Sequence, residues 1–560
     1  PLVPPDRCFE LTERVTHEGV ALAALDGAEI DALAEALRKS GAESVALCFL
    51  FSFLRPEHEA TVTQRLRDAG FLVSASNEIL PEFREYERAS TTAVNAYVTP
   101  ILSRYLGHLE DALEGRDFRV MQSNGGSIRA AEARTQAVRT ILSGPAGGTV
   151  GAVHVGKVAG FDRVVGFDMG GTSTDVSLSL GGPQVTTESE IGGLPIRIPV
   201  IDIHTVGSGG GSIAYMDEGG ALRVGPESAG SDPGPVCYGR GGCRPTVTDA
   251  NVVLGRLAPE HFLGGEMALD VAGATAALDE LGRQAGVEPS ESLTIAQAAG
   301  LGVVEVVNAH RERAVRVISV ERGHDPTDFV FLSFGGAGGL HACDLARGLG
   351  MGRVLAPYGA STLSAFGMLV ADVVKDYVRT VMLPGTTEPA SLSEMFVPLV
   401  ERGRRETVAE GVPEQDVTVH RELDMRYRGQ SYELTVQLTP DYAGAFHRVH
   451  GERYGHSDED TPVEIVNLRV RAVGRTPTPV VAAVEGGSED ATRATRGGRE
   501  VVLDGAAVEA DFYDGEGLRP GMRLSGPAGV MQRDTTILLG DGDRAVVDAW
   551  RNVVVEVKAP

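Results

Sequence analysis

The amino-acid sequence predicts an α/β protein of two or three domains that ends in a β-rich segment. Three observations support this class. Helix-like and strand-like stretches alternate over roughly the first 120 residues, apolar strands run into glycine-rich loops in the middle, and strand-like stretches dominate after about residue 383. The length of 560 residues exceeds the roughly 250 to 300 that one hydrophobic core supports, so several domains are expected.

In the first segment, 1–95, and at the beginning of the second, predicted helices and strands alternate, as is typical of an α/β protein. Apolar residues recur at helical spacing up to Leu37, and Gly41 is expected to end that helix. The elements expected here are a helix over 30–37, a strand from Val45, a helix from Pro56, a strand over 71–73, a long amphipathic helix over 90–113 and a short strand over 118–121.

The second segment, 96–382, holds the glycine-dense loops, and the third, 383–560, is expected to form a β-rich C-terminal domain. The elements expected here are a helix over 295–317, a strand over 329–334, further strands over 417–419, 432–437 and 464–473, and a loop or linker over 485–498. These three segments are the predicted domains.

Composition excludes several classes of partner. The 77 acidic residues exceed the 51 basic ones, giving a formal net charge of −26, so the average surface repels nucleic acid. The longest apolar stretch, 45–54, is too short to span a bilayer, and no signal peptide opens the sequence, so no membrane association is expected. The five scattered cysteines are typical of a reducing compartment, and we expect a cytoplasmic protein.

The sharpest motif runs from Val164 to Leu178. An apolar strand delivers Asp168 at its end, two glycines and three hydroxyl residues follow, and Asp175 starts the return strand. A nucleotide's phosphates are met by backbone N–H groups, and any side chain at the two glycines would hold them away. The pattern therefore predicts a phosphate-binding hairpin. Its phosphate-contacting residues are Gly170, Gly171, Thr172 and Ser173.

Two carboxylates beside a phosphate site need a cation between them and the ligand. Asp168 and Asp175 would repel bare phosphate, so we expect them to hold Mg²⁺ through water, as that ion prefers. A Walker-type loop does not explain the site, because no Gly-x-x-x-x-Gly-Lys-Ser/Thr occurs.

A second glycine loop follows the strand that ends at Phe334. Strand, glycines and helix follow in that order, so bare backbone can support a planar base or ribose. The residues predicted to do so are Gly335, Gly336, Gly338 and Gly339. His341 behind them has three readings: a ligand contact, a helix cap, or a satisfied core histidine.

A third candidate site lies between Asp202 and Ser212. Alternation places Asp202 and His204 on one strand face, before a glycine loop that includes Gly209 and Gly210. These residues are candidates to hold a metal or orient a substrate phosphate, with Asp232 and Asp249 as additions. The alternative is a polar loop that ties down packing. Cys237 and Cys243 lack zinc-ligand spacing. Arg426, Arg428 and Arg469 are interpreted as surface or strand-edge charges without chemistry.

Beyond these single motifs, the sequence resembles the hydantoinase A/5-oxoprolinase β-subunit family over nearly its whole length. The stretches that carry the resemblance are Pro81–Arg88, Met121–Gly126, Leu142–Gly147, Phe167–Asp175, Asp202–Ser212, Gly234–Gly239, Thr246–Asn251, Val320–Asp325 and Asp424–Gln430. The resemblance implies an actin-like ATPase (ribonuclease H-like) core, with the Asp168 hairpin as second phosphate loop and Gly335–Gly339 as adenosine loop.

The implied function is ATP- and Mg²⁺-dependent phosphorylation of a carbonyl oxygen in a cyclic amide such as a hydantoin or 5-oxoproline. Asp168, Asp175, Asp202 and His204 are the expected catalytic residues. A B-type partner subunit would complete ring-opening hydrolysis, which implies a hetero-oligomer. Two alternatives stay open: the β subunit of an ATP-dependent acetone or acetophenone carboxylase, and an actin-like ATP-driven activating or reactivating protein.

One feature departs from the family pattern. Members carry another Asp-x-Gly-Gly-Thr loop, the first phosphate loop, before the point that matches Pro1, and this sequence has none. About one small domain's worth of residues is expected to be absent. Three explanations stay open: these residues were lost or cleaved from this chain, they reside on another chain, or this form does not bind ATP productively.

Overall fold

The computed structural model describes residues 2–559 and divides into two compact units. Unit 1 combines residues 1–146, 185–201 and 371–477, and unit 2 combines 147–184, 202–370 and 478–560. Each unit is thus assembled from segments that lie far apart in the sequence. The expected division into three consecutive domains stays a prediction.

The N-terminal part of unit 1 is a small α/β layer. Strands β3 (Ser44–Leu47) and β4 (Leu72–Ala75) pair in parallel, which requires the crossover helix α2 (Glu57–Asp68) between them. Helix α1 (Gly27–Ser40) is capped by Asp26, and it ends at Gly41 in the left-handed conformation. The other elements up to residue 133 are β1 (Arg14–Val15), β2 (Ala21–Ala23), α3 (Ser76–Ile79), α4 (Glu85–Ala112), β5 (Arg119–Met121), β6 (Ser127–Arg129) and α5 (Ala130–Ala133).

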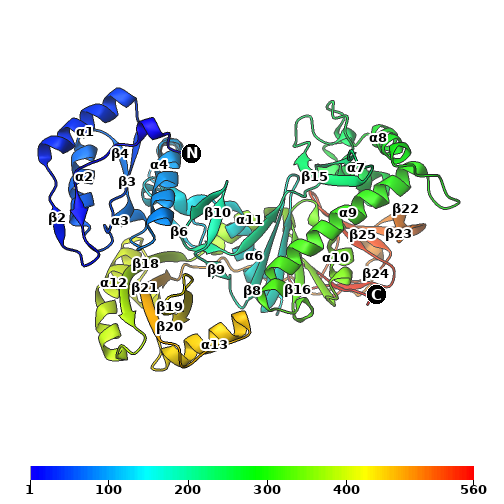
Figure 1. The fold of residues 1–560 in the computed structure, drawn as a ribbon. Coiled ribbons are helices and arrows are strands. Elements are labelled where there is room, and N and C mark those ends of the chain that lie inside the picture. The colour runs from blue at the N-terminus through cyan, green and yellow to red at the C-terminus, as the bar shows by residue number, and fades with distance from the viewer. Residues whose placement is uncertain (1, 560) are drawn as a thin grey trace. The chain divides into compact units, whose positions relative to one another are not determined.

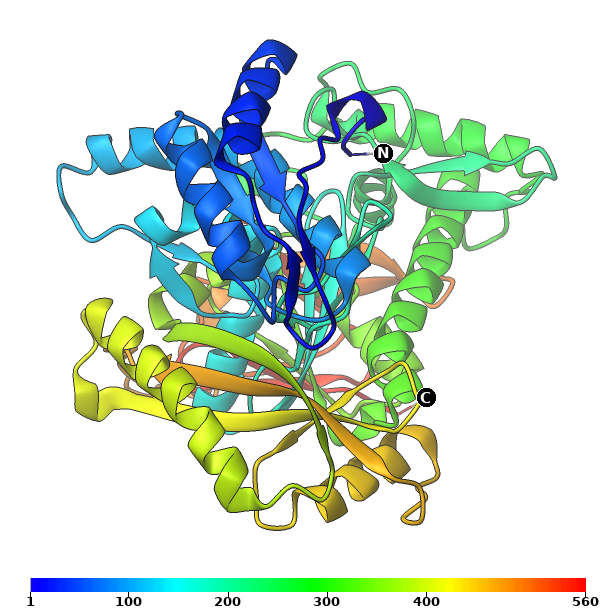
Figure 2. The ribbon, with the colours of Figure 1, turned by 60° about the vertical axis from the view of Figure 1, so that its left-hand side comes forward.

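The larger part of unit 1 is a six-stranded sheet in the order β20-β19-β21-β18-β6-β5. Its long strands alternate apolar and polar residues, and helix α12 (Pro389–Ala409) lies across the apolar face (Figure 2). The elements that complete this layer are β18 (Val373–Pro384), β19 (Val417–Tyr427), β20 (Leu434–Gln437), α13 (Tyr442–Tyr454) and β21 (Val463–Gly474). Two small hairpin-like pairs join β10 (Ser189–Ile191) to β11 (Leu194–Ile196) and β9 (Val185–Thr186) to β12 (Val200–Ile201).

The polar face of these strands carries a layer of buried ion pairs, which we call the charged layer. Glu82 accepts hydrogen bonds from Arg197 and Arg469 at 2.7 Å each, and Asp424 accepts one from Arg469 at 2.6 Å. Glu433 accepts hydrogen bonds from Arg84 and Arg197. The charged layer therefore consists of matched opposite charges.

This layer corrects the interpretation of three arginines. The side chains of Arg469 and Arg426 are only 11% and 15% exposed and form ion pairs inside unit 1, so their reading as surface charges was wrong. Arg428 is exposed, as expected. The physical reason is that β19 and β21 are central strands of the sheet, so their polar face is covered.

Unit 2 is built on an eight-stranded mixed sheet in the order β13-β8-β7-β16-β17-β28-β27-β24. Helix α9 (Ile295–Ile318) runs along β8 and β13 (Figure 1), and it begins with a capping box formed by Thr294 and Gln297. The strands are β7 (Arg163–Met169), β8 (Thr174–Leu180), β13 (Ile203–Val206), β16 (Val330–Phe334), β17 (Arg353–Ala356), β24 (Arg523–Ser525), β27 (Arg544–Val547) and β28 (Val553–Glu556).

The C-terminal strands of unit 2 extend this sheet and form a second one, in the order β22-β23-β25-β26. The remaining elements of unit 2 are β14 (Ser212–Met216), β15 (Leu222–Ser228), α7 (Val247–Val253), α8 (Val271–Gln284), α10 (Ala342–Gly348), α11 (Leu363–Val370), β22 (Thr495–Leu503), β23 (Ala506–Asp514), β25 (Ala528–Met531) and β26 (Thr536–Leu539). Helix α6 (Ser143–Val158) begins in unit 1, with residues from 147 onward in unit 2.

Most predicted elements are present and agree within about three residues, but several boundaries are wrong. The strand expected over 417–419 continues to Tyr427. The expected loop over 485–498 ends early, because β22 starts at Thr495 and pairs with β23. The long amphipathic helix also starts earlier than expected, at Glu85. Over residues 2–559, no helix combines the length and the apolar character that crossing a membrane demands.

Candidate nucleotide site

The hairpin of β7 and β8 forms as the sequence predicted. The two strands pair antiparallel, and Asp168 stands directly opposite Asp175. The turn between them is closed by a hydrogen bond from the Gly170 N–H to the Ser173 carbonyl at 3.1 Å. The residues expected to meet phosphate, Gly170 to Ser173, therefore make up the turn itself.

The two glycines of the turn are not required by the protein's own backbone or packing. Neither Gly170 nor Gly171 has the left-handed backbone angle that favours glycine. A Cβ added at Gly171 would meet no described atom within 4 Å, and Gly171 and Thr172 are exposed. A glycine with free space around it is explained by something that approaches from outside, which supports the phosphate-loop prediction.

The two carboxylates lie close enough to affect each other's ionisation. Burial and, to a smaller extent, the nearby Asp175 charge raise the pKa of Asp168 to about 6, although the Ser364 hydroxyl opposes both effects. Burial also raises the pKa of Asp175, against a hydrogen bond of 2.5 Å from the Thr205 hydroxyl. Within residues 2–559 neither carboxylate forms an ion pair, so negative charge accumulates here without a basic partner.

This uncompensated pair fits a bound cation. Among the described residues no group of three or more His, Cys, Asp or Glu side chains is arranged to hold a metal. Mg²⁺ commonly takes only one or two protein carboxylates, with waters and substrate phosphates as its other ligands. Asp168 and Asp175 are therefore the residues that would hold magnesium, and this assignment stays a prediction.

The loop after β13 clamps the turn of the hairpin. The N–H groups of Gly210 and Gly211 donate to the carbonyls of Gly170 and Gly171 at 3.0 and 2.6 Å. A Cβ at Gly209 would lie 2.5 Å from the backbone of Gly171, so glycine is required there for close approach. The structure gives Gly209 and Gly210 a supporting role, and their direct contact with nucleotide stays a prediction.

Asp202 and His204 are not brought together with the acid pair. In the register of β13 and β8, Thr205 stands opposite Asp175, and alternation places positions 202 and 204 on the other face. The Asp202 carboxylate forms an ion pair with Arg322. The catalytic assignment of these two residues stays a prediction that the placement does not support.

The other candidates near this loop have structural partners. Asp249 is fully buried and closes a capping box with Thr246, while also accepting hydrogen bonds from the backbone of Cys237 and Val236. Asp232 is exposed. Asp249 thus fixes local backbone.

The glycine loop after β16 lies beside the hairpin. β16 is parallel to β7 with Phe334 opposite Asp168, so both loops leave the same edge of the sheet. Gly335 has a φ of 78°, and a Cβ there would lie 2.5 Å from the Asp168 carboxylate. Gly336 is exposed, whereas Gly338 and Gly339 are buried. Contact of these four glycines with adenosine stays a prediction. Of the four, the exposed Gly336 is the one best placed to make such a contact.

His341 is a satisfied core histidine. It is fully buried, with Nδ1 2.9 Å from the Asn308 side-chain oxygen and Nε2 3.3 Å from the Asn251 amide. Burial and two nearby arginines hold its pKa well below the usual range. The imidazole is therefore neutral, and the third reading of this residue is the one that the structure supports.

A fully buried arginine that the sequence did not reveal lies beneath the clamp loop. Arg311 of α9 donates to the Ser208 carbonyl at 3.3 Å and to Asn308 at 3.4 Å, and no described carboxylate pairs with it. Burial lowers the pKa of Arg311 to about 9. Its Nε and the hydroxyl of Ser208 lack hydrogen-bond partners among the described residues. An unmatched positive charge thus lies next to Gly209, which contacts the phosphate turn.

Thr205, Ser364 and Arg311 are the site residues that sequence reasoning missed. Thr205 sits inside a recognised motif, and pairing β13 with β8 would have placed it opposite Asp175. Arg311 lies on the buried stripe of a helix whose apolar spacing was visible, so a basic residue on that stripe was the signal. Nothing local marks Ser364, which reaches Asp168 only through the fold.

Comparison with known proteins agrees with this geometry. The hydantoinase/oxoprolinase family model matches residues 88–377, the family's N-terminal region matches 1–70, and its C-terminal domain matches 386–557. The chain belongs to the hydantoinase/oxoprolinase family. The resemblance inferred from the motifs is confirmed.

Named relatives in this family act on different substrates. The chain is 35% identical to caprolactamase subunit alpha of Pseudomonas jessenii, over 98% of this chain and 81% of that protein. It is 33% identical to 5-oxoprolinase 1 of Arabidopsis thaliana, over 95% of this chain and 44% of that protein.

Two solved structures resemble the whole chain. One is the ATP-dependent caprolactamase of Pseudomonas jessenii, with a TM-score of 0.89 and 32% identity over 99% of this chain and 82% of the other. The second is nucleotide-free acetone carboxylase, with a TM-score of 0.77 and 28% identity over 100% of this chain and 82% of the other. The mixed α/β fold with a large β-rich part is therefore shared with family members named as ATP-dependent enzymes.

Proposed function

We propose that this chain uses Mg·ATP to phosphorylate the carbonyl oxygen of a small cyclic amide, so that a partner subunit can hydrolyse the activated ring. The observation that carries the proposal is the hairpin turn, where two glycines that the fold does not need, Gly170 and the exposed Gly171, stand beside two carboxylates without a basic partner. Triphosphate and its divalent counter-ion match both features.

The chemistry explains why a cyclic amide would need ATP. Its carbonyl carbon is a poor electrophile and its nitrogen a poor leaving group. In the proposed step the carbonyl oxygen bonds to the γ-phosphorus, the bond to the β–γ bridging oxygen breaks, and ADP leaves with that electron pair. Water then adds to the activated carbon, and the ring C–N bond breaks as the nitrogen takes up a proton, which leaves an acyl phosphate. A second water attacks the carbonyl carbon of this acyl phosphate, so the carbon–oxygen bond breaks and phosphate leaves with the original carbonyl oxygen. Magnesium supplies charge neutralisation across the transferring group.

The chain's own residues have defined parts in this proposal. The turn from Gly170 to Ser173 holds phosphate, and Asp168 and Asp175 hold the cation in their ionised form. Thr205 and Ser364 stabilise that form, because a hydroxyl donated to a carboxylate favours its charge. Arg311 supports the clamp loop from below. The common edge of β7 and β16 supports the finer proposal of an actin-like ATPase core.

The amide-hydrolysing function is favoured over ketone carboxylation by the closer structural match, a TM-score of 0.89 against 0.77. A B-type partner and assembly as a hetero-oligomer in the cytoplasm are part of the proposal, supported by the relative named as a subunit. The actin-like activating protein of the reductase type would need an iron–sulfur cluster, and within residues 2–559 the five cysteines belong to no group of three or more potential metal ligands.

Oxygen labelling tests the proposed step. The full-length protein and its partner subunit are incubated with Mg·ATP and a lactam, 5-oxoproline or hydantoin that carries ¹⁸O in its carbonyl group. Transfer of the label to the released phosphate is expected, and unlabelled phosphate with ring opening would refute the proposal. A matched reaction with labelled acetone and bicarbonate identifies the carboxylase instead. Asp168→Asn is the control that should lose both ATP turnover and labelling.

A further inference from the structure

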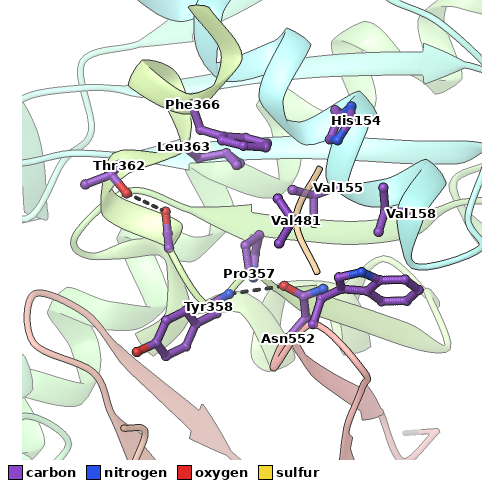
Figure 3. A pocket seen from close by; sticks show the side chains of 12 residues that line it. His154, Val155, Val158, Pro357, Tyr358, Thr362, Leu363, Phe366, Val481 and Asn552 are labelled. Atoms are coloured by element: carbon purple, nitrogen blue, oxygen red, sulfur yellow. Dashed lines mark hydrogen bonds between the residues drawn. The ribbon is translucent and has the colours of Figure 1, made fainter. Parts of the chain in front are cut away.

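Unit 2 contains an apolar pocket that the proposed reaction does not use. Its volume is about 190 Å³. It is lined from four places in the chain, as Figure 3 shows: helix α6, the segment from Pro357 to Phe366, the linker at Val481 and the turn between β27 and β28. The aromatic residues among its lining are Tyr358, Phe366 and Trp550.

The lining defines what the pocket can accept. The Asn552 side chain is occupied, because its oxygen accepts from the Tyr358 N–H at 3.2 Å and its amide donates to Asp548 at 2.7 Å. Thr362 donates to the Gly359 carbonyl. His154 packs edge-on against Phe366 and forms no hydrogen bond with another described residue. The pocket thus offers apolar and aromatic surface and one free imidazole.

The state of that imidazole excludes a charged occupant. Burial, together with the adjacent Lys157 charge, lowers the pKa of His154, so the ring is neutral near pH 7. Among the described residues, no Asp, Glu, Lys or Arg side chain lines the pocket. An apolar cavity of about 150 Å³ accepts benzene, so a pocket of this size holds one ring with a small substituent.

The wall of the pocket is also a wall of the nucleotide site. In the segment from Pro357 to Phe366, the side chains of Leu363 and Phe366 line the pocket. From the same segment, the Ala360 carbonyl accepts from the Gly335 N–H at 3.1 Å, and the Ser364 hydroxyl lies close enough to Asp168 to lower the pKa of that carboxyl. Adjacent residues thus contact the pocket and the metal-site carboxylate.

The helices behind this wall touch backbone to backbone. A Cβ at Gly151 of α6 would lie 2.5 Å from the Leu363 carbonyl of α11, and one at Gly147 would lie 2.7 Å from the Ser364 carbonyl. No side chain separates the helices at these points, so a shift of α11 is not absorbed by rotamer changes. Displacement on the pocket side is therefore passed to Ser364.

We propose that this pocket is a regulatory site for an uncharged single-ring molecule, which changes the affinity for Mg·ATP by moving the segment from Pro357 to Phe366. The first part of the proposal, that a ring binds here, depends only on the pocket, and we call it the binding half. The second part, that its binding changes the affinity for Mg·ATP, rests on the proposed nucleotide site, and we call it the coupling half. Because coupling between two sites is reciprocal, Mg·ATP would change the affinity for the ring by the same factor.

The only tryptophan of the chain, Trp550, lines the pocket and reports on its occupancy. Phenol is the probe, because it is one neutral ring with a hydroxyl that can bond to His154. Benzoate is the matched charged ring. We expect phenol, but not benzoate, to change Trp550 emission saturably. Val155→Phe should abolish this response by filling the pocket, whereas Val480→Phe, at a 93% exposed neighbour of Val481, should keep it.

The results separate the two halves of the proposal. A non-saturable phenol response, equal binding of benzoate, or unchanged binding in Val155→Phe would overturn the site. If phenol binds as expected, the Kd for Mg·ATP should change about fivefold or more. Phenol binding with an unchanged Kd would overturn the coupling. Loss of Mg·ATP binding without any ring present would instead count against the proposed function and leave the binding half supported.

Discussion

Unit 1 and unit 2 both bury charged side chains, but the charges of the charged layer in unit 1 have partners of opposite charge, whereas those near the candidate nucleotide site in unit 2 do not. In the charged layer of unit 1, Glu82 accepts from Arg197 and Arg469, and Glu433 accepts from Arg84 and the same Arg197. In unit 2, Arg311 is fully buried without a carboxylate, and Asp168 faces another acid. Matched buried charges hold a structure in one arrangement, while unmatched ones leave electrostatic free energy that a ligand of opposite charge can recover.

Whether a buried charge has a partner of opposite charge therefore distinguishes structural from functional charged residues, without reference to any sequence motif. Pro81–Arg88 and Asp202–Ser212 both carried the family resemblance, yet only the second borders the unmatched group. The pairing state of each charge therefore predicts the consequence of its removal. We expect loss of stability for the matched charges of unit 1, and loss of nucleotide affinity without loss of stability for the unmatched Asp168 and Arg311 of unit 2.

The largest effect is expected for Glu82→Ala. It leaves Arg197 and Arg469 buried without their partner, which costs about 3–5 kcal/mol. Hydrogen exchange of β18, β19 and β21 should accelerate. The thermal unfolding of unit 2, followed by the fluorescence of Trp550, serves as reference. Glu35→Ala, which breaks an exposed pair with Arg38, is the control. Exchange as slow as in the unaltered protein would show that the layer is not stabilising.

Asp168→Asn should give the next largest effect and depends on pH. The folded pKa of about 6 lies above the usual value of 3.8, so the folded state binds more protons. The contribution of Asp168 to stability is present below pH 3.8 and is lost as the pH rises through about 6. The variant should therefore be more stable by about 1–3 kcal/mol at pH 8 and no more stable at pH 3.5.

Thermal melting between pH 3.5 and 8 checks this, with and without Mg·ATP. Ligand-induced stabilisation should appear in the unaltered protein as the pH rises through 6, because the cation needs the ionised carboxylate, and should be absent in the variant. Equal stability of both proteins at pH 8 would contradict the raised pKa.

Arg311→Met tests whether an unmatched buried charge contributes to nucleotide affinity and not to stability. Removing an unpaired buried charge should leave the free energy of unfolding unchanged or higher, while the Kd for Mg·ATP weakens about tenfold, or about 1.4 kcal/mol. Calorimetric titration should show a smaller loss for ADP and none for adenosine. Arg256→Met is the control, because Arg256 pairs with Asp344 at 3.4 Å and should lose stability. Destabilisation of Arg311→Met with unchanged affinity would make Arg311 structural.

The smallest effect is expected for Asp202→Asn. Its partner Arg322 has a side chain that is 45% exposed, and such pairs contribute about 0–1 kcal/mol. Because Asp202 lies on the face away from the acid pair, ATP turnover should stay within about twofold of the unaltered protein. A tenfold loss of turnover with retained stability would restore Asp202 to the catalytic group.

The sequence predicted the parts of the site that adjoin one another along the chain. The turn from Gly170 to Ser173 and its flanking acids follow from strand alternation and glycine position. Partners contributed across the fold, such as Ser364 on Asp168, needed the packing of α11 against the sheet. The misread Arg469 shows the same limit, because burial of a strand's polar face depends on which segment covers it.

The path of the chain through its two units has a practical consequence for anyone who wishes to dissect the protein. The backbone passes from one unit to the other after residues 146, 184, 201, 370 and 477, so a single cut never releases either unit whole. Simple truncations would sever the eight-stranded or the six-stranded sheet. An isolated unit 2 would need its three pieces spliced by short engineered linkers.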